Sequence, residues 1–240
     1  MNGHIHHKEF GKGEPLVLLF SLGLTSYSYE SCARKLAKKY RVIVPDLYRG
    51  RSRHDTNAST LDDYVEALHA FLHDVPLKRY NLIGFSFGGL IASEYLFRYP
   101  EELQKVMLVS TYPPLSQEKP TVISGMQGYM KLLYHNMYSR KGMQVNRLWF
   151  KDSLFNLFLP HPKQFFMDPI IATKKRTKKK GMIPVRTKIL AATNDEFISY
   201  DQYQSMKLVE NLELETVDGY HAWFFLDEAL LVKKIIEYLG

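Results

Sequence analysis

A serine between glycines is the first residue whose setting suits covalent chemistry. Gly84-Phe85-Ser86-Phe87-Gly88 matches the pattern G-x-S-x-G, and it lies between an apolar run, Tyr80–Ile83, and a helical pattern, Phe87–Tyr99. A sharp turn from strand to helix projects the serine hydroxyl above a sheet, and glycines at both sides let neighbouring backbone approach. The N-terminus of the helix favours developing negative charge. We therefore predict that Ser86 is a nucleophile; the alternative is a glycine-rich turn whose serine caps the helix.

A serine nucleophile needs a general base to accept its proton. Three histidines follow Ser86 in the chain, namely His135, His161 and His221. His221 directly follows a strand-like run, Leu212–Val217, at the strand end where open α/β sheets place their sites. His135 and His161 fall in a central segment without strands. We therefore predict that His221 is the base.

The base in turn needs an acid that orients its ring. Asp195 follows the strand-like run Thr187–Ala192 at its carboxyl end, and we predict that it is this acid. Glu196 is adjacent and is an open alternative. Asp218 shares a loop with His221, so its expected role is to shape that loop.

Strand-like and helical patterns alternate over most of the chain, which predicts a mostly parallel central sheet with helices on both faces. The expected strands are His4–Phe10, Pro15–Phe20, Arg41–Pro45, Asn81–Gly84, Lys105–Ser110, Thr187–Ala192 and Leu212–Val217. The expected helices are Tyr29–Tyr40, Leu61–Val75, Phe87–Tyr99, Asp201–Val209 and Asp227–Leu239.

The alternation stops in the middle of the chain. Residues 114–181 hold no clear strand, and we predict a mainly helical insertion at 113–184, with a core formed by 1–112 and 185–240. Apolar residues recur there at helical spacing, at Tyr129, Met130, Leu133, Tyr134 and Met137. Such a stripe is typical of internal packing, or it forms a tolerant apolar wall over a site.

The chain resembles the α/β-hydrolase family. The resemblance rests on the elbow around Ser86, on the order Ser86, Asp195, His221, and on Pro45-Asp46-Leu47-Tyr48-Arg49-Gly50-Arg51-Ser52, which is similar to the family's segment after an early strand. It covers nearly the whole chain, with the insertion where the family commonly carries a cap. It implies the α/β-hydrolase fold and a catalytic triad of these three residues.

The resemblance also implies an oxyanion hole made of backbone N–H groups. One donor is then Phe87, the residue after the nucleophile, and the other is Leu24, with Gly23 as the alternative if the alignment shifts by one residue. The family often has His-Gly where this chain has Leu22-Gly23. A backbone donor survives a change of side chain, so the hole is expected to persist.

These residues predict a serine hydrolase that cleaves esters of small to medium hydrophobic acyl groups without metal or organic cofactor. The expected pocket residues are Leu22, Gly23, Phe85 and Trp223. Thioester hydrolysis, hydrolysis of a carbon–carbon bond and acyl transfer use the same triad, so these reactions stay open. A hydrolase homologue that binds a ligand without turning it over is a further alternative.

Length and composition exclude other classes of protein. The chain has 240 residues, of which 45% are hydrophobic and 24% charged, so it buries a sizeable core and is not disordered throughout. The single cysteine, Cys32, excludes an intramolecular disulfide and a cysteine-based zinc site, and a cytoplasmic location is expected. No run reaches the roughly 18 apolar residues of a membrane helix, and Pro15–Leu24 lacks the flanks of a signal peptide.

The net charge of +7 is partly local, because residues 174–180 carry six positive charges. Such a run is typical of a solvated loop, and it also attracts nucleic acid, anionic membranes or acidic substrates. No aromatic residues are interleaved with it, so nucleic acid is not expected as a partner. His4, His6 and His7 lie in a short alternating segment, His4–Phe10, which indicates a first strand rather than a metal site or a tag.

Overall fold

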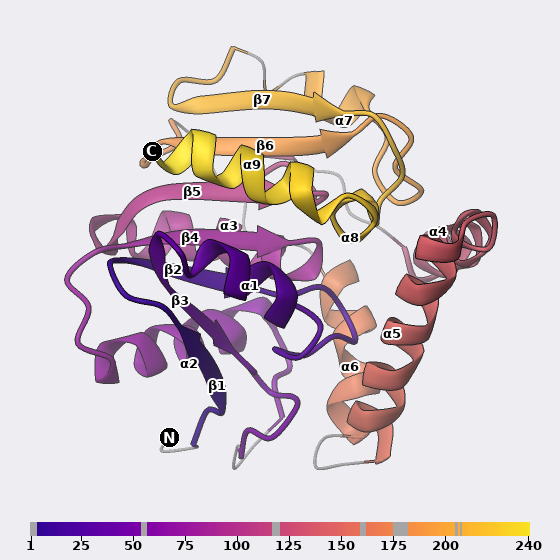
Figure 1. The fold of residues 1–240 in the computed structure, drawn as a ribbon, viewed down its shortest axis with the longest axis horizontal. Helices are drawn as coiled ribbons and strands as arrows, with labels where there is room; N and C mark the ends of the chain where they lie inside the picture. The colour runs from indigo at the N-terminus through magenta and orange to yellow at the C-terminus, as the bar shows by residue number, and fades with distance from the viewer. Residues whose placement is uncertain are drawn as a thin grey trace.

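The computed structural model describes residues 4–53, 57–116, 121–158, 162–174, 182–204, 206 and 208–240. Within them a seven-stranded sheet has the order β1-β3-β2-β4-β5-β6-β7, and only β1 is antiparallel to its neighbour (Figure 1). The strands are β1 (His7–Phe10), β2 (Glu14–Leu19), β3 (Tyr40–Pro45), β4 (Tyr80–Phe85), β5 (Leu103–Val109), β6 (Thr187–Ala192) and β7 (Leu212–Val217).

Helices cover both faces of the sheet. The described helices are α1 (Glu30–Leu36), α2 (Leu61–Asp74), α3 (Phe87–Arg98), α4 (Val122–Asn136), α5 (Arg140–Phe158), α6 (Pro162–Thr173), α7 (Asp201–Gln204), α8 (Trp223–Leu226) and α9 (Glu228–Leu239), with a short 3₁₀ helix at Pro100–Glu102. The predicted α/β class, with a mostly parallel sheet between helices, is thereby confirmed.

Two hydrophobic cores lie on opposite faces of the sheet, because side chains alternate along each strand. Val17 and Leu19 of β2 pack in a core with α2 and α3. Leu16 and Leu18 pack in the other core with α1 and α9. The central strands are mainly apolar since both of their faces are covered.

Several elements are shorter than their sequence patterns. The first strand begins at His7 instead of His4, and α1 ends at Leu36, four residues before β3 begins. Helix α7 ends at Gln204, and residues 205 and 207 of its expected range lie outside the described residues. The short helix α8 was not predicted, because its four residues span about one turn.

Helices α4, α5 and α6 come from the central segment and lie beyond the carboxyl ends of the parallel strands, at the right of Figure 1. The expected boundaries of the insertion, 113 and 184, remain a prediction. Of the basic run 174–180, only Lys174 lies within the described residues. Among the helices described, none is both long and apolar enough to cross a membrane.

Candidate active site

Ser86 lies on a tight turn between β4 and α3. Its φ of 49° and ψ of −112° are rare for a residue with a side chain, and the surrounding backbone enforces them. A Cβ at Gly84 would lie 2.5 Å from the Gly88 carbonyl oxygen, and one at Gly88 would lie 2.4 Å from the Leu19 carbonyl oxygen. Only glycine fits at these two positions, so the motif fixes how closely β4, α3 and β2 approach one another.

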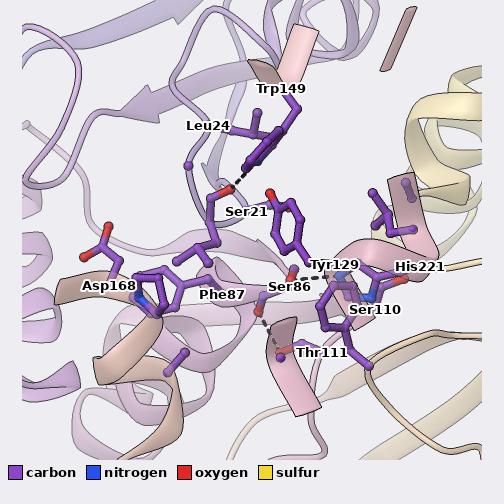
Figure 2. A pocket seen from close by; sticks show the side chains of 18 of the residues that line it. Ser21, Leu24, Ser86, Phe87, Ser110, Thr111, Tyr129, Trp149, Asp168 and His221 are labelled. Atoms are coloured by element: carbon purple, nitrogen blue, oxygen red, sulfur yellow. Dashed lines mark hydrogen bonds between the residues drawn. The ribbon is translucent and has the colours of Figure 1, made fainter. Parts of the chain in front are cut away.

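The structure brings the three predicted residues together through two hydrogen bonds. His221 Nε2 lies 2.9 Å from Ser86 Oγ (Figure 2). His221 Nδ1 lies 2.7 Å from Asp195 Oδ2. The side chain of Asp195 is fully buried, and its Oδ1 accepts hydrogen bonds from the backbone N–H groups of Phe197 at 2.8 Å and Ile198 at 3.1 Å. With the Nδ1 proton donated to Asp195, Nε2 is free to accept the Ser86 hydroxyl proton.

Glu196, the alternative acid, contacts the same loop differently. Its Oε2 accepts the backbone N–H of His221 at 2.8 Å, and its Oε1 lies 2.8 Å from Nδ1 of His135 on α4. His135 stacks on Tyr220 with ring centroids 4.1 Å apart. Glu196 therefore holds the backbone of His221 and links it to α4, whereas Asp195 holds the ring.

The other candidates named from the sequence do not join this arrangement. His161 lies outside the described residues. Asp218 accepts the hydroxyl proton of Thr193 at 3.1 Å and so ties the loops after β6 and β7 together. No group of three histidine, cysteine, aspartate or glutamate side chains is arranged to hold a metal ion in the part of the chain that the structure describes.

The pKa of His221 is set by opposing effects. Burial lowers this pKa because it disfavours the imidazolium, but the charge and hydrogen bond of Asp195 and the charge of Glu196 outweigh burial, so the pKa lies above the ordinary 6.5. A base must be neutral to accept a proton, so a raised pKa moves the onset of activity to higher pH.

We therefore expect kcat/KM for an activated ester to rise with pH through one ionisation whose midpoint lies above 6.5. The measurement is a pH profile of p-nitrophenyl butyrate hydrolysis from about pH 5 to pH 9. A midpoint below that of free histidine would show that burial outweighs the two carboxylates, and a flat profile would exclude His221 as the base of the slow step.

The two predicted oxyanion donors are the backbone N–H groups of Phe87 and of Leu24, which lies in loop 21–25 after β2. Phe87 is the first residue of α3, where backbone N–H groups have no acceptor within the helix. The Leu24 N–H donates to the Ser21 carbonyl oxygen at 3.2 Å in a turn in which Gly23 has a φ of 75°. The Leu24 N–H, the predicted oxyanion donor, thus already donates a long hydrogen bond within the loop.

Helix α5 holds loop 21–25 through hydrogen bonds that sequence reasoning missed. Asp152 accepts the Thr25 backbone N–H at 3.0 Å and its hydroxyl at 2.9 Å, and Asn156 Nδ2 donates to the Gly23 carbonyl oxygen at 3.1 Å. Trp149 Nε1 donates to the Leu22 carbonyl oxygen at 3.4 Å.

A buried ion pair joins the same loop to α6. Arg49 Nη1 donates to the carbonyl oxygens of Ser21 at 3.1 Å and Leu24 at 3.2 Å, and Nη2 donates to Asp168. Burial lowers the Arg49 pKa, but the charge of Asp168 together with the contributions of Tyr64 and Asp46 outweighs burial, so the pKa is raised and the guanidinium stays charged. The sequence held one signal that could have singled out Asp152 and Asp168, because they are the only acidic residues between positions 121 and 174.

A cavity of about 410 Å³ opens above Ser86, between the sheet and helices α4 to α6. Tyr129 of α4 and Trp149 of α5 are in contact at its wall, with ring centroids 4.6 Å apart (Figure 2). Among the described residues that line it, His221 and Asp168 are the only acidic or basic side chains. The rest of the wall is mainly apolar, which suits a hydrophobic ligand.

Two of the four residues predicted to line the pocket do line this cavity, namely Leu22 and Gly23. Phe85 and Trp223 do not. Phe85 is fully buried in the core that contains residues of α1 and α9, because its side chain points to the face of β4 that these helices cover. Trp223 is buried in the same core, and its Nε1 donates to Ser110 Oγ at 3.1 Å.

The comparison with known proteins agrees with this fold. A family model described as the alpha/beta hydrolase fold matches residues 14–138. A pimeloyl-[acyl-carrier protein] methyl ester esterase of Vibrio campbellii is 29% identical over 120 residues, which are 50% of this chain and 46% of that protein. A putative non-heme chloroperoxidase of Synechocystis is 31% identical over 113 residues, 46% of this chain and 41% of that protein. The match thus spans less than half of each of these relatives.

Solved structures resemble the chain along nearly its whole length. A marine microorganism esterase superposes with a TM-score of 0.76 at 20% identity, covering 98% of this chain and 99% of that one. The enol-lactonase from Burkholderia xenovorans superposes with a TM-score of 0.76 at 17% identity, covering 98% and 96%. At these identities the likeness establishes the fold alone.

Proposed function

Because the chain belongs to the α/β-hydrolase family, we propose that it is a serine hydrolase that cleaves esters of small to medium hydrophobic acyl groups. The observation that carries this proposal is the continuous set of hydrogen bonds from Ser86 through His221 to Asp195, with the serine at the wall of a mainly apolar cavity. The methyl ester esterase among its relatives by sequence supports the same reaction class.

In this mechanism Ser86 Oγ attacks the ester carbonyl carbon while His221 Nε2 accepts its proton. Asp195 keeps the ring in the required tautomer and stabilises the imidazolium. His221 then donates the proton to the leaving alcohol as the carbon–oxygen bond breaks, which leaves an acyl-enzyme. Water, deprotonated by the same histidine, hydrolyses the acyl-enzyme and restores Ser86.

The negative charge on the tetrahedral intermediate needs backbone donors. We assign one of them to the Phe87 N–H at the start of α3. The second comes from Leu24, which would exchange its 3.2 Å bond to Ser21 for one to the oxyanion, or from neighbouring Gly23. Because Arg49 and Asn156 bind carbonyl oxygens of this loop, they hold its N–H groups in a fixed direction.

The central segment, residues 113–184, then acts as a cap that forms the acyl-binding wall. Leu132 and Leu148 line the cavity from α4 and α5, and Phe165 lines it from α6. Lys131 and Arg140 are exposed and do not line it. Asp168 lines it, but its charge is compensated by Arg49. A neutral acyl chain is therefore favoured over a charged one.

A series of p-nitrophenyl esters tests this function. Each methylene buried in an apolar wall contributes about 0.8 kcal/mol, or nearly fourfold in kcat/KM. We expect kcat/KM to rise from acetyl toward butyryl or hexanoyl and to fall once the chain outgrows the cavity of about 410 Å³. A strict preference for acetyl, or for a dicarboxylic half-ester over its neutral analogue, would contradict the assigned substrate class. Absence of steady turnover with every ester would contradict the hydrolase.

A further inference from the structure

One side of α4 exposes a row of large apolar side chains to solvent. Val122, Met126, Met130, Tyr134 and Met137 recur at intervals of three or four residues, which places them along one face of the helix, and each is 50–68% exposed. We call these five residues the α4 ridge. A contiguous exposed apolar surface of this kind is unusual for a surface without a partner.

The α4 ridge begins at the mouth of the cavity. Val122 and Met126 are exposed and also line the cavity, and so do Phe166 and Pro169 of α6. The mouth therefore lies between the N-terminal half of α4 and the middle of α6, and exposed apolar side chains border it. An amphiphile bound along the ridge would find an apolar path to Ser86.

The exposed charged side chains of the described residues on and next to α4, α5 and α6 are all positive. Asp152 and Asp168, the only acidic residues in 121–158 and 162–174, are buried. The basic residues there are exposed, and they are Lys131, Arg140, Lys141, Arg147, Lys151, Lys163 and Lys174. The described surface of α4 to α6 thus offers apolar and cationic groups to a partner and no exposed carboxylate.

We propose that the α4 ridge docks the protein on an anionic lipid surface, with the cavity mouth facing the lipid. Helix α4 itself carries one lysine, Lys131, and the other exposed lysines and arginines lie on α5, on α6 or directly after it. Exposed apolar side chains combined with lysine and arginine are the chemistry that binds the headgroup region of a bilayer. Each lysine or arginine near such a surface strengthens binding by about fivefold. Flexible methionine side chains adapt to a fluid surface. The docking does not depend on the proposed hydrolase activity.

The test uses co-sedimentation with vesicles, carried out with the Ser86→Ala variant so that turnover does not change the lipid. We expect binding to vesicles of phosphatidylcholine with about 30% phosphatidylglycerol, and binding at least about tenfold weaker to phosphatidylcholine alone. High salt should weaken the binding, since it screens the lysine and arginine charges. Equal binding to both vesicles, or to neither, overturns the proposal.

Two pairs of variants locate the surface. Met130→Glu should weaken binding about tenfold or more, because it places a charge on the ridge, whereas Leu208→Glu should not, although Leu208 is 99% exposed. Lys131→Glu should weaken binding at least about tenfold, because it replaces an attractive charge by a repulsive one, whereas Lys233→Glu on α9 should change it far less. Equal losses within either pair show that the ridge is not the docking surface.

An acidic protein is the other occupant that this charge pattern fits. The same variants are therefore tested against an acidic acyl-carrier protein by titration calorimetry. Saturable binding to that protein that Met130→Glu abolishes, with no preference for anionic vesicles, assigns the ridge to a protein partner and overturns the lipid proposal. Circular dichroism checks that each variant is folded.

Discussion

Replacing Ser86 with alanine is expected to lower kcat by about 10⁴-fold or more, because the attacking oxygen is removed and no neighbouring group replaces it. In a well-studied serine protease the same change costs about 10⁶-fold in kcat. The protein should stay folded, since the lost hydroxyl is bound through a single side-chain hydrogen bond, to His221. The measurements are steady-state hydrolysis of p-nitrophenyl butyrate and the melting temperature.

Ser93→Ala is the matched control. Ser93 lies on α3, the helix that begins directly after Ser86. It is buried, does not line the cavity, and donates its hydroxyl proton to the Gly89 carbonyl oxygen at 2.8 Å. It should keep kcat within about threefold of the starting protein, because its effect is on helix stability alone. If Ser86→Ala keeps more than about a tenth of the activity, Ser86 is not the nucleophile.

Asp195→Asn is expected to lower kcat by about 10⁴-fold, the loss known for this change in another triad enzyme. Asn presents an N–H group or a neutral oxygen to His221 Nδ1, which favours the wrong tautomer and removes the charge that stabilises the imidazolium. The variant's remaining pH profile should shift to lower pH, because the Asp195 charge and hydrogen bond are the largest contributions that raise the pKa of His221.

Glu196→Gln is the matched change at the adjacent buried carboxylate. An amide can still accept the His221 backbone N–H and bond to His135, so the loop keeps its shape, and a loss within about tenfold in kcat is expected. If Glu196→Gln costs more than Asp195→Asn, the acid assignment is wrong by one residue.

The fold follows from local patterns that are visible in the chain itself. The strands Glu14–Leu19, Tyr80–Phe85 and Thr187–Ala192 are predictable because the sheet is covered on both faces and each strand contains a short, mainly apolar run. The alternation of strands and helices predicts parallel strands, whose carboxyl-end loops meet at one edge of the sheet. Asp195 and His221 follow such strands, so they lie at the same edge as Ser86.

Contacts between distant segments were not predictable. The sequence near Phe85 and Trp223 is apolar, but which face a residue takes depends on the register of the strand or helix, and both side chains point into the core. The hydrogen bonds that Asp152 accepts from loop 21–25 and that Asn156 donates to it span more than 120 residues of sequence, and no local pattern encodes such pairings. They depend on how α5 docks, which is a property of the packed structure.

The polar contacts between loop 21–25 and helices α5 and α6 have a consequence for redesign of the protein. If the helices over the cavity were independent of the sheet, they could be exchanged to alter substrate selectivity without a change in the catalytic residues. Here Asn156 and Asp168 belong to those helices, yet they bond to loop 21–25 and to Arg49 of the core. A transplanted set of helices must therefore carry matching polar groups, since otherwise a graft intended to change selectivity would also loosen the catalytic machinery.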